Sequence, residues 1–176
     1  MRGEDKIADK LDNISFVRNV NGAPAELSAK QKSGYREGLN SVVYFAMLPY
    51  KLLDKAVNAV YKGDQKIKGK NYSMVEVTFD QEGGGKDYQD IFMYWIDTET
   101  HTMDFLAYSY HVNGGGVRFR EAYNPRTVSG VVFQDYVNFK ADLSISLDKL
   151  PALWEAGELK ELSRIDTEDV VDLSGK

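Results

Sequence analysis

Two neighbouring segments decide the fold of this chain: IFMYWID at residues 91–97 and TMDFLAYSY at residues 102–110. Each segment carries aromatic or large apolar residues at odd and even positions, so both faces of the strand are apolar. A sheet that places only one face against a core does not need this pattern. The pair therefore predicts a strongly curved antiparallel sheet whose concave face holds something apolar, either a lid helix or a lipid-like ligand.

The alternation of apolar and polar residues extends outward from residue 72 to residue 140, with turns rich in Gly or in Asp and Thr between the segments. This arrangement is typical of a string of antiparallel hairpins. Asn124-Pro125-Arg126 should break the strand that begins near Val117, because proline cannot donate to the ladder. The strands expected over the whole chain are 16–20, 57–68, 74–79, 91–97, 102–111, 117–123, 131–139 and 159–165.

The helical signals are confined to two regions. Apolar residues recur at three- and four-residue steps from Ser28 to about Tyr50, and Pro49 should end or kink this main helix, which we expect to be mostly buried. A short helix is expected at 148–156, followed by Gly157 as a stop. The fold class predicted is α+β: one large, strongly curved antiparallel sheet with the main helix packed in its concave face and a short C-terminal helix.

The 176 residues suit a single domain, 1–176, and the net charge of −5 with scattered basic residues predicts no nucleic-acid partner. Cysteine is absent, which excludes a disulfide framework, a thiolate metal site and a cysteine nucleophile. The longest apolar stretch, 42–50, falls short of the ~20 residues that cross a bilayer, so no transmembrane segment is expected. The charged first residues lack the apolar region of a signal peptide.

Three stretches of this chain, 40–52, 94–113 and 118–124, together carry a family resemblance. With them, the chain from about Lys6 to about Asp169 resembles an uncharacterised bacterial cell-envelope family, which is itself similar to the LolA-like superfamily of lipoprotein carriers. The similarity between that family and the lipoprotein carriers depends on two features. One is a helix that ends in Leu-Pro, and the other is a strand that ends in Ile-Asp and is followed by a Thr and the next strand.

The resemblance implies a half-barrel of antiparallel strands around a hydrophobic cavity that a helix closes. It also implies a location in the periplasm or cell envelope, with a hydrophobic small molecule or an acylated protein as partner and contacts to the membrane or to envelope proteins. Members of the family usually carry an export signal and further strands ahead of the point where this chain starts. We therefore expect a truncated domain whose sheet lacks its first strands and presents an open edge.

Aromatic and aliphatic walls with few polar groups are what an apolar ligand selects. One alternative is that the aromatic residues only pack the core, and another is that the helix is an ordinary helix on a sheet. Arg118 and Arg120 could hold a phosphate or carboxylate head group. The alternative for this pair is that they bond to acids such as Asp104 or Glu121. The ligand-binding residues predicted are Val42, Phe45, Leu48, Trp95, Phe105, Tyr123, Phe133, Arg118 and Arg120.

We predict no catalytic residue, no metal site and no cofactor. The two histidines, His101 and His111, fall short of a zinc ligand set, and no Gly-x-Ser-x-Gly motif is present. The function expected is a non-enzymatic envelope protein that binds a lipid-like ligand and releases it by moving the helix at 41–52. Two alternatives stay open: a structural or protein-interaction module with a filled core, and a hydrolase or lyase that combines the arginine pair with Asp97 or Glu121.

Overall fold

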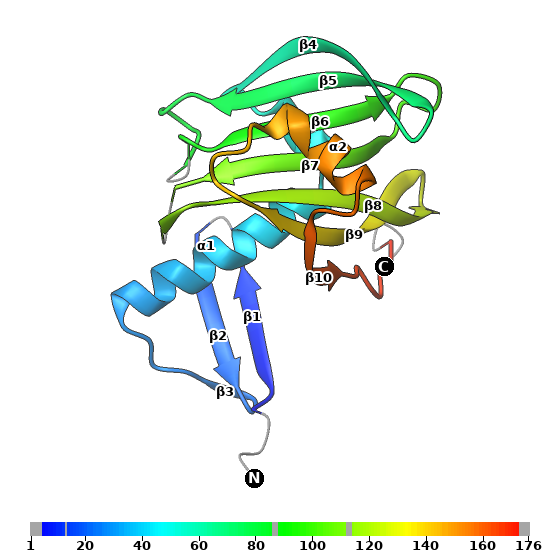
Figure 1. Cartoon of the computed structure of the whole chain (residues 1–176). Helices are drawn as coiled ribbons and strands as arrows, with labels where there is room; N and C mark the ends of the chain where they lie inside the picture. The colour runs from blue at the N-terminus through cyan, green and yellow to red at the C-terminus, as the bar shows by residue number, and fades with distance from the viewer. Residues whose placement is uncertain (1–4, 13, 86–87, 112–113, 173–176) are drawn as a thin grey trace. The chain divides into compact units, whose positions relative to one another are not determined.

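The computed structural model describes residues 5–12, 14–85, 88–111 and 114–172 (Figure 1). Its contacts divide the chain into two compact units, one ending at Lys51 and the other beginning at Leu52. Each unit is described by itself, and the single domain expected from the length stays a prediction. Among the described residues, no helix is both long enough and apolar enough to span a membrane.

The first unit holds a small sheet with the order β1-β2-β3 and one helix. A tight hairpin turn at Asn21-Gly22 joins the second and third strands, and both of its residues have positive φ, +52° and +86°. Strand β1 was not expected from the sequence, and it pairs antiparallel with β2. The elements are β1 (Ile7–Leu11), β2 (Phe16–Val20), β3 (Ala23–Pro24) and α1 (Ala29–Ala46).

Helix α1 begins with a capping box, in which the Ser28 side chain accepts from the Gln31 backbone and the Gln31 side chain accepts from the Ser28 backbone. It ends at Ala46, ahead of Pro49 and earlier than the end near Tyr50 expected from the sequence. The expectation that this helix is mostly buried was wrong, because none of its residues is buried. Val42, one of its apolar residues, is 64% exposed.

The second unit contains a seven-stranded antiparallel sheet with the order β10-β9-β8-β7-β6-β5-β4. The sheet is not closed, since β4 and β10 are its two edges. The α+β class and the large antiparallel sheet are therefore confirmed. A 3₁₀ turn, η1 (Tyr50–Leu53), precedes strands β4 (Val57–Ile67), β5 (Lys70–Phe79), β6 (Ile91–Asp97), β7 (Met103–Tyr110), β8 (Gly116–Val128), β9 (Val131–Ala141) and β10 (Lys160–Ile165).

Strand β8 corrects one prediction, because it continues through Pro125 to Val128. A shift in its register against β9 lies between Tyr123 and Arg126, and Asn124 there has a φ of +50°. A bulge of this kind leaves a residue outside the ladder, so a proline without an N–H can be accommodated. Asn113, in the turn expected before this strand, lies outside the described residues.

The chain leaves β9 through residues 142–148, which we call the strap. The last two residues of the strap begin η3 (Leu147–Lys149), and α2 (Leu150–Glu155) follows before β10. The predicted short helix and its stop are confirmed, since the Gly157 N–H bonds to the Trp154 carbonyl. In Figure 1, α2 lies across the sheet. The core beneath the strap and α2 comprises Ile67, Tyr72, Met93, Trp95, Phe105, Ala107, Val117, Phe119, Leu147 and Leu150.

Candidate functional site

A cavity of about 470 Å³, here called the strap groove, lies between one face of the sheet and the strap. Its floor comes from four consecutive strands, β5 to β8, because residues that are register partners on adjacent strands present their side chains to the same face. The floor residues are Met74, Glu76, Ile91, Met93, Ser109 and Val117, the strap residues are Leu143, Ile145, Ser146, Leu147 and Asp148, and Lys62 of β4 completes the lining.

The centre of the strap groove is apolar and its charged groups belong to three residues. Met74 and Met93 supply flexible, polarizable thioethers that adapt to a ligand's shape. The Lys62 ammonium lies 3.2 Å from the Glu76 carboxylate, and both side chains are partly exposed. An amphipathic molecule could therefore bury its apolar part over the methionines and keep its polar part near these charges.

The strap takes its shape from a turn at its start. The Asp142 carboxylate accepts hydrogen bonds from the Ser144 backbone N–H and hydroxyl, which lowers the pKa of Asp142. The Ile145 N–H bonds to the Asp142 carbonyl, and Leu147 is buried against the core. The apolar residues of the strap alternate with polar ones. Strap residues line the groove and leave a cavity between the strap and the sheet.

Trp95 and Phe105, two of the predicted ligand-binding residues, lie beside the strap groove in the core. Trp95 is fully buried, and Phe105 is 6% exposed with its ring centroid 5.0 Å from that of Trp154. Leu150 of α2 belongs to the same cluster. The space over these two residues is therefore occupied by side chains of this chain, and the residue that reaches the groove is Met93, two positions before Trp95.

The predicted arginine pair shares one face of β8, opposite the core. Val117 and Phe119 belong to the core cluster, so the alternation along the strand directs the residues after each of them to the other face. The Arg118 guanidinium donates to the Tyr110 hydroxyl at 2.6 Å, and that of Arg120 donates to the Tyr108 hydroxyl at 3.0 Å. Both of these bonds go to tyrosine hydroxyls, and head-group binding by the pair stays a prediction.

The other predicted residues lie in different places. The Tyr123 hydroxyl donates to the Asp166 carboxylate, and Phe133 is half-buried on β9 opposite Arg126. Val42 and Phe45 of α1, and Leu48 just after this helix, belong to the first unit. None of these residues lines the strap groove.

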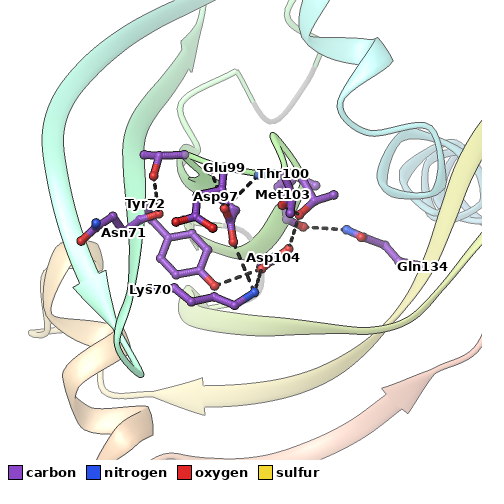
Figure 2. Close-up of polar contacts among 11 residues, drawn as sticks. Lys70, Asn71, Tyr72, Asp97, Glu99, Thr100, Met103, Asp104 and Gln134 are labelled. Atoms are coloured by element: carbon purple, nitrogen blue, oxygen red, sulfur yellow. Dashed lines mark hydrogen bonds and ion pairs between the residues drawn. The ribbon is translucent and has the colours of Figure 1, made fainter.

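The carboxylate of Asp97 belongs to a polar cluster at the end of β6 (Figure 2). It accepts the N–H groups of Glu99 and Thr100 at 2.8 and 3.1 Å and lies 3.3 Å from the Lys70 ammonium. The bonds to the two turn amides, and then the lysine, lower the pKa of Asp97. Asp97 lies two positions after Trp95 on the core face, so the strand alternation separates it from the two arginines.

A second carboxylate in this cluster, Asp104, accepts from the Tyr72 and Thr102 hydroxyls at 3.0 and 2.7 Å. Burial, and then the contact with Asp104, raises the pKa of Tyr72. The contacts hold the turn between β6 and β7 (Figure 2). Within the part of the chain that the structure describes, no group of three or more His, Cys, Asp or Glu side chains could hold a metal ion.

The sequence pattern of one protein family matches residues 5–167, which is most of the chain. The chain belongs to the family of unknown function DUF6503. No match was found among curated proteins, and none among solved structures. In this DUF6503 protein, the geometry of the strap groove is therefore the feature that indicates a function.

Sequence reasoning missed the strap groove in this DUF6503 protein, although a signal for the strap exists. Residues 142–148 read DLSISLD, in which Leu143, Ile145 and Leu147 alternate with serine or aspartate. This alternation is typical of an extended segment with one apolar face. It predicts a chain that lies over an apolar surface, which is what the strap does.

Proposed function

We propose that this protein binds a hydrophobic or acylated ligand, of the lipid or lipoprotein type, in the strap groove. The observation that supports the proposal is a groove of about 470 Å³ whose floor combines four apolar residues with Glu76 and Ser109, and whose lining holds more apolar than polar or charged residues. Sites for small molecules are of this kind, with volumes of about 300–1,000 Å³ and mostly apolar linings. The binding needs no catalytic step.

The affinity would come from removing apolar ligand surface from water, at about 25 cal/mol for each Å². The two methionines of the floor can change rotamer to follow ligands of different shape. The charged end of the ligand would stay hydrated near Lys62 and Asp148, because burying an unpaired charge is costly. Selectivity would then favour amphipathic molecules over purely apolar ones.

The proposal includes a half-barrel of the LolA-like kind and work in the periplasm or cell envelope, in contact with the membrane or with envelope proteins. An open sheet of seven antiparallel strands with one covered face supports this architecture. We assign ligand release to movement of the strap, since five of its seven residues line the groove. A lid role for residues 41–52 stays a prediction.

A second candidate function is a protein-interaction module with a filled core. Two observations favour it. The Trp154 side chain of α2 contacts Phe105, and Leu150 of α2 belongs to the core cluster that contains Trp95. In addition, edge strand β4 carries the exposed side chains of Val60 and Tyr61, and an edge strand can pair with an extended segment of another protein. Under this function, the strap groove would stay empty.

A charge placed in the strap groove tests the first proposal. Ile91 lines the groove and is 38% exposed, so Ile91→Lys should fold while it directs an ammonium into an apolar site. Val132→Lys is the matched control, since Val132 is 50% exposed on β9 and lies outside the lining. Both variants have the same change in charge and would be compared by the uptake of a fluorescent fatty acid.

We expect Ile91→Lys to weaken fatty-acid uptake on the order of tenfold or more, because an unpaired ammonium in an apolar site opposes the ligand chain. Val132→Lys should bind as the unchanged protein does, and both variants should keep the native circular dichroism spectrum. If the unchanged protein takes up no fatty acid and carries no lipid in native mass spectrometry, the lipid-binding proposal is wrong and the interaction module is favoured.

A further inference from the structure

A second groove, of about 420 Å³, lies on the other side of the strap, near α2 and β10. Its apolar lining comes from Ala141, Ile145, Leu153 and Leu159. Its charged lining comes from Lys140, Asp142, Glu158 and Lys160. Among the residues that line the two grooves, Ile145 is the one they share.

Ile145 holds a defined position between the grooves. It is half-buried and packs against the core cluster, as Leu153 and Leu159 of the second groove also do. The strap backbone is secured on both sides of it, by the Asp142–Ser144 turn before it and by buried Leu147 after it. Shortening the Ile145 side chain should therefore leave the path of the strap in place.

We propose that Ile145 is a partition that sets the maximum length of the ligand chain. This inference rests on the proposed function of the strap groove. With Ile145 present, an acyl chain ends against its side chain. Without it, the end of a longer chain passes under the strap and contacts Leu153 and Leu159 in the second groove. Ile145 is thus a specificity-determining residue for chain length.

The experiment measures the affinity of the unchanged full chain and of Ile145→Ala for straight-chain fatty acids of about 8 to about 20 carbons. Each methylene that enters an apolar groove should raise the affinity about fourfold, and the gain should stop when the groove is full. For the unchanged protein we expect a plateau at one length. For Ile145→Ala we expect the plateau at a chain longer by two or more carbons.

Two alanine variants serve as matched controls. Leu143 lies on the same strap but lines only the strap groove, so Leu143→Ala should weaken binding at every chain length and leave the plateau where it is. Leu153 lines only the second groove, so the single variant Leu153→Ala should bind fatty acids as the unchanged protein does. In the Ile145→Ala background, Leu153→Ala should reduce the added affinity for the longer chains.

Ile145→Phe provides an independent variant with a larger side chain, which should move the plateau to shorter chains even if Ile145→Ala fails to fold. If the unchanged protein binds fatty acids but neither variant moves the plateau, the partition is wrong and the proposed function stands. If the unchanged protein binds no fatty acid of any length, the proposed function itself is wrong. These two failures are therefore distinguishable.

Discussion

The indole N–H of Trp95 donates a hydrogen bond to the side-chain oxygen of Gln65 over 2.7 Å. The amide of Gln65 donates in turn to the main-chain oxygen of Asp148, at the end of the strap, over 3.2 Å. One glutamine on β4 therefore connects a fully buried tryptophan of the sheet to the segment that walls the groove. This connection makes the position of the strap dependent on the core.

Replacing Gln65 by Ala should lower the free energy of unfolding of the second unit by about 1–3 kcal/mol, because the buried Trp95 N–H loses its partner. Urea denaturation followed by tryptophan fluorescence measures this change. Lys66→Ala, at the exposed neighbouring position of the same strand, should change stability by less than about 0.5 kcal/mol. Equal effects of the two substitutions would show that the hydrogen bond contributes nothing.

The contact between Phe105 and Trp154 should hold α2 on the sheet. Phe105→Ala removes a buried ring and should lower the free energy of unfolding by about 3–5 kcal/mol. A double-mutant cycle with Trp154→Ala should give a coupling energy of about 0.5–1.5 kcal/mol, as for aromatic pairs in contact. A coupling energy near zero would mean that α2 does not pack on Phe105.

Asp97 should make the protein sensitive to acid. Its pKa is lowered in the folded protein, so its contribution to stability is present above its unfolded pKa of about 3.9 and is lost as the pH falls through the folded value. Asp97→Asn removes this titration. The midpoint of urea denaturation should therefore fall less steeply in Asp97→Asn than in the unchanged protein between about pH 5 and pH 2; identical slopes would contradict the prediction.

Two glycines should respond oppositely to replacement by alanine. Gly34, inside helix α1, has open space where a Cβ would lie, so Gly34→Ala should stabilise the helix by about 0.5–1 kcal/mol. At Gly84 a Cβ would clash with the Asp80 carbonyl oxygen and with the Cβ of Phe79, so Gly84→Ala should be destabilising. Thermal denaturation by circular dichroism should show a higher melting temperature for the first variant and a lower one for the second.

The elements of this fold could be predicted from local patterns. The alternation in residues 91–97 predicts β6, Ser28 with Gln31 marks the start of α1, and Gly157 marks the end of α2. Each of these signals acts within a few residues. The path of β8 through Pro125 could not be predicted, because the bulge depends on pairing with β9.

The candidate site was harder to predict than the fold. An aromatic strand face indicates burial, and the sequence does not show whether a ligand or another segment of the chain covers it. Here, Trp154 lies against Phe105, Leu150 belongs to the same core cluster, and Met93 lines the groove. The difference depends on where the strap crosses the sheet, which is a contact between residues far apart in the sequence.

The central claim, that an apolar ligand occupies the strap groove, is tested most directly by NMR of methionine methyl groups. Met74 and Met93 line the groove, whereas Met47 and Met103 do not. On titration with a saturated fatty acid, the methyl signals of Met74 and Met93 should shift or broaden, with those of Met47 and Met103 unchanged. Signals that all stay in place at a saturating concentration, or a change at Met47 alone, would contradict the account.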